Sequence, residues 1–393
     1  MIIEPKVREY ICTTAHPKGC EESVRRQAEY AAKKGVTEGT RKALIIGCST
    51  GYGLASRISA LVNCEAATLG IMFERPANGR RTATPGWYNT AAFEKLSREK
   101  GIYARTINGD AFSEEVKAQT IEVIKQELGC VDLVVYSLAA PRRTDKEGKT
   151  WSSCLKTTEK SFTEKSLDLR TNEITEKTIP AATEEEVLGT VKVMGGEDWA
   201  DWIEALSAAG VLAENAVTVA YSYIGPKLTY PIYYEGTIGA AKQHLHRTAA
   251  ELNRHYPGLR AYISVNKGLV TQASAAIPVV PLYFSILYKV MKEQGNHEGC
   301  IEQMTRLYTE KLYTANGPVT DGNGFIRMDD HELTEQVQKQ VQEAWEKVTT
   351  ENMARYCDLE GYWEDFYHMF GFHYDNIDYT ADVDPDVKIG SIS

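Results

Sequence analysis

The chain has 393 residues, of which 43% are hydrophobic and 25% are charged. This mix is ordinary for a globular protein and excludes a disordered, collagen-like or coiled-coil chain. The formal net charge is −10 and the chain has no basic cluster, so we expect no binding to nucleic acid or anionic lipid. The eight cysteines form no Cys-x-x-Cys pair, and charges interrupt the N-terminal segment MIIEPKVREY. We therefore expect a cytoplasmic protein in a reducing compartment.

Apolar β-branched runs alternate with helical patterns from about residue 43 to residue 265, which predicts repeated βα units around a parallel sheet. The expected strands are 43–48, 67–73, 103–108, 132–138, 217–223 and 260–266. The expected helices are 53–62, 88–99, 112–128, 183–193, 197–209 and 237–255. Several strands are continuous apolar runs, as in strands that helices cover on both faces. The predicted fold class is therefore α/β, with a doubly wound Rossmann-type parallel sheet.

Residues 142–180 interrupt this alternation. They are rich in Thr, Lys, Glu and Ser, and we expect an inserted hairpin or lid. After Pro281 the pattern predicts a helical C-terminal extension, with helices at 282–293, 297–311 and 331–348 before an aromatic segment at 361–372.

Residues 268–288 carry no charge and are about long enough to span a bilayer, but Pro278 and Pro281 interrupt them. We expect a buried wall there and no membrane span. No low-complexity linker or internal repeat divides the chain. We therefore expect one integrated Rossmann-type domain over residues 1–393, with an insertion at about 142–180 and substrate-pocket helices at about 275–320.

A glycine-rich turn follows the first expected strand and opens the first expected helix. It reads Gly47-Cys48-Ser49-Thr50-Gly51-Tyr52-Gly53. In such a turn the first glycine allows a tight bend, and the second lets the backbone approach a pyrophosphate. The third lets the helix pack on the sheet, with the helix N-terminus facing the phosphates. This context favours a dinucleotide site over a purely structural turn.

The carboxyl ends of the next strands are where ligands of open parallel sheets bind. Glu74, after Phe73, lies 21 residues beyond Gly53 and is placed to accept hydrogen bonds from an adenosine ribose. A carboxylate there repels a 2′-phosphate, which favours NADH over NADPH, although the neighbouring Arg75 softens this preference. The alternative for Glu74 is a solvated charge at a strand end. We expect Asp110-Ala111 near the adenine and Leu138-Ala139 beside the ribose and nicotinamide.

Tyr233 and Lys242 stand nine positions apart, at the start of a predicted helix. A tyrosine near a lysine can act as an acid at neutral pH, because the ammonium favours the phenolate left after proton donation. This device is typical of oxidoreductases. A chain with 22 tyrosines also forms such a pair by chance, so the spacing alone leaves both interpretations open.

Together these motifs resemble the family of trans-2-enoyl-CoA reductases and FabV-type enoyl-ACP reductases. The resemblance extends from Thr13-Thr14-Ala15-His16-Pro17 to His297-Glu298-Gly299. It also includes Tyr221–Pro226, Val193–Trp199 and Asn266–Thr271. The resemblance implies a large monomeric relative of the short-chain dehydrogenases. Such an enzyme reduces the carbon–carbon double bond of a trans-2-enoyl thioester with NADH.

The resemblance implies a proton donor at Tyr233, a second tyrosine near the substrate carbonyl at Tyr223, and a cofactor-binding Lys242 that also holds the pKa of Tyr233 down. The resemblance makes the uncharged stretch after Thr271 part of an acyl pocket. The spacing of the histidines, at His244-Leu245-His246 and His297-Glu298, predicts no metal site. The NADH contacts that it implies are Gly47, Cys48, Ser49, Thr50, Gly51, Tyr52, Phe73, Glu74, Asp110, Ala111, Leu138, Ala139, Lys242, Leu269, Val270 and Thr271.

The carrier of the acyl chain is left open. We favour coenzyme A because an acidic chain suits an acidic acyl carrier protein poorly, and Asn266-Lys267-Gly268 resembles the coenzyme A members. An enoyl-ACP reductase of fatty acid synthesis is the alternative. More distant alternatives are a 3-ketoacyl or hydroxyacyl thioester dehydrogenase of the same fold and a non-catalytic NADH-binding protein.

Overall fold

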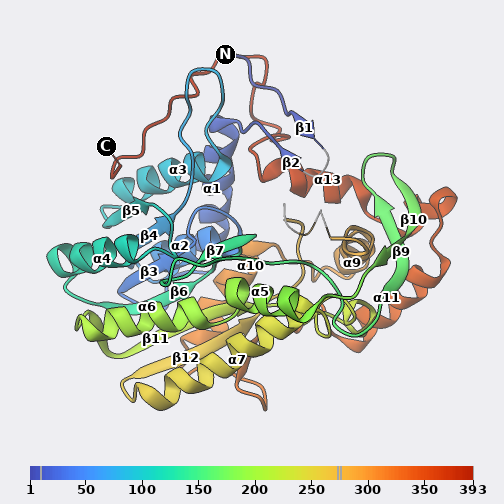
Figure 1. Ribbon diagram of the computed structural model, residues 1–393. Helices are drawn as coiled ribbons and strands as arrows, with labels where there is room; N and C mark the ends of the chain where they lie inside the picture. Colours follow the sequence, from blue (N-terminus) through green and yellow to red (C-terminus); the bar gives the residue numbers. More distant parts are fainter. Residues whose placement is uncertain (9–10, 272–273, 275–276, 393) are drawn as a thin grey trace.

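The computed structural model describes residues 1–8, 11–271, 274 and 277–392 (Figure 1). Within these residues, the largest sheet has seven parallel strands in the order β13-β12-β11-β6-β3-β4-β5. Its strands are β3 (Lys42–Ile46), β4 (Ala67–Met72), β5 (Ala104–Asn108), β6 (Val131–Tyr136), β11 (Leu212–Ser222), β12 (Leu259–Val265) and β13 (Phe325–Arg327). The first six confirm the expected strands, whereas the short edge strand β13 was not predicted.

The sheet is wound in both directions from β3. Strands β4 and β5 follow on one side, and β6, β11, β12 and β13 follow on the other. The strand order reverses between β3 and β6, which places a crevice at the carboxyl ends of these two strands. Ligands of doubly wound sheets bind at such a switch point. The predicted α/β Rossmann-type class is confirmed.

Helices cover both faces of the sheet. One face carries α1 (Pro17–Lys33), α2 (Gly51–Asn63), α3 (Pro85–Glu99) and α10 (Cys300–Arg306), which continues into a π-helical turn, η3 (Leu307–Leu312). The other carries α4 (Glu114–Val123) with η1 (Ile124–Leu128), α6 (Glu197–Ala208) and α7 (Thr237–His255), on which α5 (Glu184–Met194) packs. Each face of the sheet has its own apolar core. In β3, Ile45 lies in the core beneath α1, α2, α3 and α10, and Ile46 lies in the core beneath α4, α6 and α7. Burial on both faces explains why the strands are apolar throughout.

Helix α1 was not predicted. It begins at Pro17, and the His16 side chain caps it by accepting a hydrogen bond from the Gly19 amide at 3.3 Å. Its buried stripe includes small residues such as Cys20 and Ala28. Ahead of it, β1 (Val7–Arg8) and β2 (Ile11–Cys12) form a short antiparallel pair.

The segment 142–180 contains two antiparallel hairpins. The first joins β7 (Arg142–Thr144) to β8 (Thr150–Ser152), and the second joins β9 (Phe162–Asp168) to β10 (Glu173–Ile179). The second hairpin lies beside α9 (Val280–Glu293) and α11 (Glu335–Lys347) in Figure 1. Lys165 Nζ donates to the Trp345 carbonyl at 2.9 Å, near the end of α11. The lysine therefore holds this hairpin on carbonyls that a helix end leaves free.

The C-terminal extension is helical, as predicted. Helices α9, α11, α12 (Met353–Tyr356) and α13 (Leu359–His368) share a third apolar core, and η4 (Thr350–Asn352) precedes α12. Within the described part of the chain, no helix is long and apolar enough to cross a membrane. The predicted pocket segment from residue 275 includes positions 275 and 276, which lie outside the described residues, as do 272 and 273. That the chain is one integrated domain stays a prediction.

A C-terminal tail returns from the third core to α3, where it ends in Figure 1. The Tyr88 hydroxyl donates to the Pro385 carbonyl at 2.8 Å, and the Ser391 amide donates to Glu94 Oε2 at 3.0 Å. The Thr106 amide of β5 donates to Ser391 Oγ at 3.0 Å. The tail therefore covers the outer edge of β5.

Candidate functional site

The predicted site residues lie just beyond the carboxyl ends of neighbouring parallel strands. Residues 47–52 follow β3, Phe73-Glu74 follow β4, Asp110-Ala111 follow β5, Leu138-Ala139 follow β6, Tyr223 follows β11, and Leu269–Thr271 follow β12. Because parallel strands all end at the same edge of a sheet, the fold gathers these residues along one edge, across the switch point.

The glycine turn combines two crowded positions with one open position. A Cβ at Gly47, whose φ is +84°, would lie 2.0 Å from the Ser137 carbonyl oxygen, and a Cβ at Gly53 would lie 1.8 Å from the Gly47 carbonyl oxygen. By contrast, a Cβ at Gly51 would meet nothing within 4 Å. Thr50 is the N-cap of α2 and makes no side-chain cap. The free amides of this helix end suit a pyrophosphate, so the residues present fit a dinucleotide.

Glu74 is held against the glycine turn. Its Oε1 accepts a hydrogen bond from Ser49 Oγ at 2.6 Å, and the Asn108 side chain bonds both backbone groups of Glu74, at 2.8 and 2.9 Å. A Cβ at Gly86 would lie 2.0 Å from Glu74 Oε1, so α3 approaches this carboxylate closely. Glu74 is therefore an ordered part of the cofactor end, whereas the Phe73 side chain is 78% exposed.

The other strand-end pairs also have local contacts. Asp110 Oδ1 accepts a hydrogen bond from the Phe112 amide at 3.0 Å, and the Ala111 carbonyl accepts one from Trp202 Nε1 at 3.0 Å. Leu138 lies over Gly47, with its Cδ2 3.1 Å from the Cβ that this glycine lacks. These residues thus shape the rim of the crevice.

Tyr52 links the glycine turn to the segment after β12. Its hydroxyl donates to the Lys267 carbonyl at 2.6 Å and accepts from Gln303 Nε2, on α10, at 2.8 Å. Gln303 Oε1 in turn accepts from the Lys267 amide at 2.8 Å. Neither Gln303 nor Lys267 was predicted to belong to the site.

Tyr223 and Tyr233 lie side by side. Their ring centroids are 4.8 Å apart at an interplanar angle of 84°, an edge-to-face contact. The chain turns back after β11 through Gly225, whose φ is +73°, and the Tyr233 amide donates to the Thr229 carbonyl at 3.0 Å. This compact loop, followed by α7, brings the two tyrosines together.

Lys242 lies in the second turn of α7, where its Nζ donates to the Tyr221 carbonyl at 3.0 Å. Burial lowers the pKa of Lys242 to about 8. The pKa of Tyr233 is raised, first by burial and then by the charge of Glu332. This direction is opposite to the expectation that Lys242 lowers it. At neutral pH Tyr233 is therefore a neutral phenol with a proton to donate.

A buried carboxylate that the sequence analysis missed adjoins the tyrosines. Glu332 is 0% exposed and accepts hydrogen bonds from the Tyr223 hydroxyl at 3.1 Å, the Tyr283 hydroxyl at 2.7 Å and the Gly268 amide at 2.7 Å. Burial raises the pKa of Glu332, and the charge of Lys267 opposes this shift. Burial lowers the pKa of Lys267 itself to about 8.

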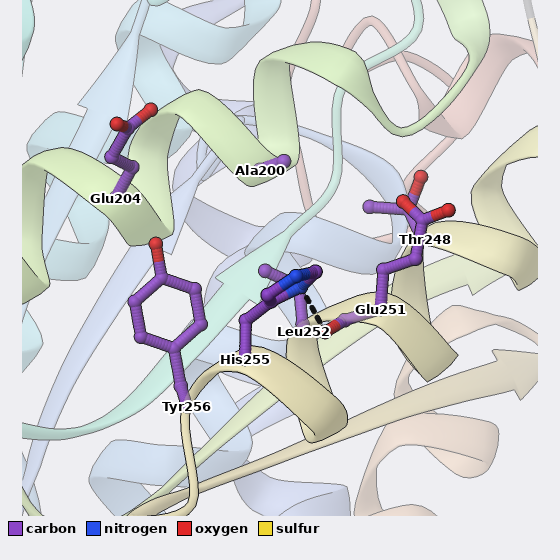
Figure 2. Close-up of a pocket in the computed structure, with 7 residues that line it drawn as sticks. All are labelled: Ala200, Glu204, Thr248, Glu251, Leu252, His255 and Tyr256. Atoms are coloured by element: carbon purple, nitrogen blue, oxygen red, sulfur yellow. Dashed lines mark hydrogen bonds between the residues drawn. The ribbon is translucent and has the colours of Figure 1, made fainter.

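A separate pocket of about 290 Å³ lies between α6 and α7 (Figure 2). Its lining residues are Ala200, Glu204, Thr248, Glu251, Leu252, His255 and Tyr256. Because α7 begins at the carboxyl edge of the sheet and runs back along it, this pocket lies toward the opposite edge. It shares no lining residue with the site described above.

Three family models match the chain. The NAD(P)H binding domain of trans-2-enoyl-CoA reductase matches residues 2–79, and the trans-2-enoyl-CoA reductase catalytic region matches residues 81–313. This chain belongs to the trans-2-enoyl-CoA reductase family. An enoyl reductase FAD binding domain matches residues 320–383 of the reductase.

Relatives with two names are equally similar to this reductase. The enoyl-[acyl-carrier-protein] reductase [NADH] of Cytophaga hutchinsonii is 54% identical over 392 residues, 99% of each chain. The trans-2-enoyl-CoA reductase [NADH] of Clostridium perfringens is 54% identical over 387 residues, 98% of this chain and 99% of the relative. The crystal structure of Treponema denticola trans-2-enoyl-CoA reductase in complex with NAD superposes with a TM-score of 0.95 at 51% identity, covering 98% of each chain. Sequence identity therefore gives the family and leaves the acyl carrier undecided.

Residues 320–383 of this reductase do not fit a flavin dinucleotide. The structure describes this whole segment, and β13 is followed by Met328–Thr334, which contains no glycine. Helices α11 and α13 pack on α9, and the segment contributes the buried Glu332 to the tyrosines. We therefore assign no step to a flavin.

Proposed function

We propose that this enoyl reductase reduces the carbon–carbon double bond of a trans-2-enoyl-CoA with NADH, giving the saturated acyl-CoA. One observation carries the proposal: a hydrogen-bonded path connects the dinucleotide turn to the tyrosine pair. Tyr52, in the turn, bonds Lys267, the next residue Gly268 bonds Glu332, and Glu332 bonds Tyr223. The cofactor end and the tyrosines are thus parts of one site.

NADH, when bound, supplies the hydride. The amides of the glycine turn would hold its pyrophosphate, Glu74 its adenosine ribose and Lys242 its nicotinamide ribose, with Asp110-Ala111, Leu138-Ala139 and Leu269–Thr271 along the crevice. The ordered Glu74 carboxylate disfavours a 2′-phosphate, so we propose that NADH is used in preference to NADPH.

The tyrosine pair faces the thioester oxygen, on which negative charge develops when the β-carbon accepts hydride. Tyr233 is 8% exposed, and its side chain makes no hydrogen bond to a described residue. Its hydroxyl is therefore available to donate to the substrate oxygen and to supply the proton that completes the reduction. In a site that excludes water, such a donor stabilises the developing negative charge strongly.

The alternative carrier is an acyl carrier protein. The Cytophaga hutchinsonii relative supports this alternative, because it is 54% identical and is named an enoyl-[acyl-carrier-protein] reductase. The apolar wall formed by α9 suits the acyl chain with either carrier.

We further propose that the reductase is a monomer that works in the cytoplasm. All eight cysteines are free thiols, as in a reducing compartment. The tail covers the edge of β5, and β13 is a three-residue edge, so neither edge offers a long surface for pairing with a second copy. Light scattering on the purified protein gives the oligomeric state, and a dimer would contradict this part of the proposal.

The test of function is the fall in NADH absorbance on adding crotonyl-CoA, beside NADPH and the same acyl group on an acyl carrier protein. We expect NADH-dependent reduction with crotonyl-CoA as the better substrate. Faster reduction of the protein-bound substrate would reassign the carrier. NADH binding without turnover of either thioester would contradict the proposed function.

A further inference from the structure

Glu332 occupies a built site rather than a surface position. It lies between β13 and α11, far in sequence from both tyrosines, and is fully buried. Three donors converge on its two oxygens: the Tyr223 and Tyr283 hydroxyls on Oε1 and the Gly268 amide on Oε2. A buried carboxylate is stable only when donors satisfy it, and this one is satisfied in part by a residue of the tyrosine pair.

The contact with Glu332 gives Tyr223 and Tyr233 different roles, because only Tyr223 donates to it. A phenol has one proton to donate. The Tyr223 hydroxyl donates it to Glu332 at 3.1 Å, whereas the Tyr233 side chain makes no hydrogen bond to a described residue. The two rings are in edge-to-face contact, and the proposed function has both hydroxyls face the substrate oxygen. Only Tyr233 then has its proton free.

Resting on the proposed function, we infer that Glu332 is a positioning residue: it binds the hydroxyl proton of Tyr223 and so leaves Tyr233 as the one donor to the thioester oxygen. The backbone fixes this arrangement, because the Gly268 amide cannot turn away from Oε2. Lys267, 2% exposed and next to Gly268, provides the positive charge that balances Glu332 in the interior.

The substitution Glu332→Gln tests the inference because it reverses the polarity at Tyr223. The side-chain oxygen of the new glutamine must face the Gly268 amide, so its NH₂ group faces the hydroxyls of Tyr223 and Tyr283. Tyr223 then accepts a hydrogen bond and its own proton is released toward the substrate. In a Tyr233→Phe background, we therefore expect Glu332→Gln to raise the depressed turnover by about fivefold or more, since Tyr223 can now donate.

The matched control is Tyr283→Phe in the same Tyr233→Phe background. It removes another donor from Glu332 but leaves the proton of Tyr223 bound, so no gain is expected. A purely structural role for Glu332 predicts that Glu332→Gln lowers turnover further in the double variant, and that result would overturn the inference. An equal gain from Tyr283→Phe would overturn it as well.

A second comparison leaves Glu332 unchanged, in case Glu332→Gln does not fold. Tyr223→Phe should cost about tenfold or less in turnover and Tyr233→Phe about 10²- to 10⁴-fold, because only Tyr233 is a donor. Equal losses would contradict the inference.

Failure of the proposed function is detected separately, by a wild-type protein that reduces no enoyl thioester. In that case the Glu332–Tyr223 contact is tested by alkaline titration, in which tyrosinate absorbance is followed in the wild-type protein and in Glu332→Gln. Removing the charge of Glu332 should lower the pH at which the neighbouring tyrosines ionise, because that charge raises the pKa of Tyr223, Tyr233 and Tyr283. The shift should become smaller in a Tyr223→Phe background, and a shift of undiminished size there would exclude the Glu332–Tyr223 contact.

Discussion

The two ends of the site are built in different ways. The phosphate cradle at the cofactor end is built from backbone: it is a continuous run from Gly47 to Gly53, closed by the glycines and by the start of α2. The tyrosine end gathers groups from five separate segments: the side chains of Tyr223, Tyr233, Tyr283 and Glu332, and the backbone amide of Gly268. A backbone cradle tolerates changes of side chain but no added atom at a crowded glycine. A side-chain cluster has the opposite sensitivity, because its chemistry resides in single polar atoms.

The largest effect that tests this contrast is expected at Tyr233. Tyr233→Phe removes one oxygen from the tyrosine end, so turnover should fall about 10²- to 10⁴-fold through loss of proton transfer. The dissociation constant of NADH, measured by fluorescence, should stay within about twofold because the glycine turn is untouched. Near-full turnover in this variant would remove Tyr233 from its proposed role.

The glycines of the turn sharpen the comparison at the other end. Gly47→Ala places a methyl group against the Ser137 carbonyl at a positive φ, so it should destabilise the fold by about 1–3 kcal/mol or more in denaturant melts.

Gly51→Ala is the matched control for Gly47→Ala. Its φ is +54° and its methyl group meets no protein atom, so the folding cost should be only about 1–2 kcal/mol. That methyl group points into the open cradle, so NADH binding should weaken about tenfold or more. If Gly51→Ala bound NADH normally, the cradle would not be the pyrophosphate site.

The smallest effect concerns pH. Burial places the pKa of Lys242 at about 8, so the ammonium is present below that pH and is lost as the pH rises through it. The attraction for an anionic cofactor weakens in the same range, and the dissociation constant of NADH should rise about threefold to tenfold between pH 7 and 9. Lys242→Arg keeps its charge throughout and should flatten this rise. An unchanged rise would assign the pH dependence to another group, such as Lys267.

The cofactor end could be predicted from sequence because its signal is local. Strand ends, glycines and Glu74 follow one another along the chain at spacings that the parallel sheet requires. The hydrogen-bond partners of individual atoms could not be predicted. Tyr52 was expected only as an NADH contact, but its hydroxyl donates to the Lys267 carbonyl.

The tyrosine end could be predicted only in part. Tyr223, Tyr233 and Lys242 follow from the family resemblance, but Glu332 lies in a run of acidic residues with Asp329 and Asp330, and nothing local separates it from them. Its importance comes from contacts with residues 109, 64 and 49 positions away. Strand β13 was missed for a similar reason: three residues carry no periodicity, and only the pairing with β12 makes them a strand.

The tail that crosses α3 bears on how the molecule is assembled during translation. Glu94 and Ser391 are 297 positions apart, so α3, β4 and β5 leave the ribosome long before the residues that cover their edge. Until then Glu94 and Thr106 lack their partners from Ser391, and closing so long a loop carries an entropic cost. The strands that are synthesised first therefore gain their last contacts at the end of translation. A substitution or truncation near residue 391 removes hydrogen bonds from α3 and β5, in the nucleotide-binding half of the protein.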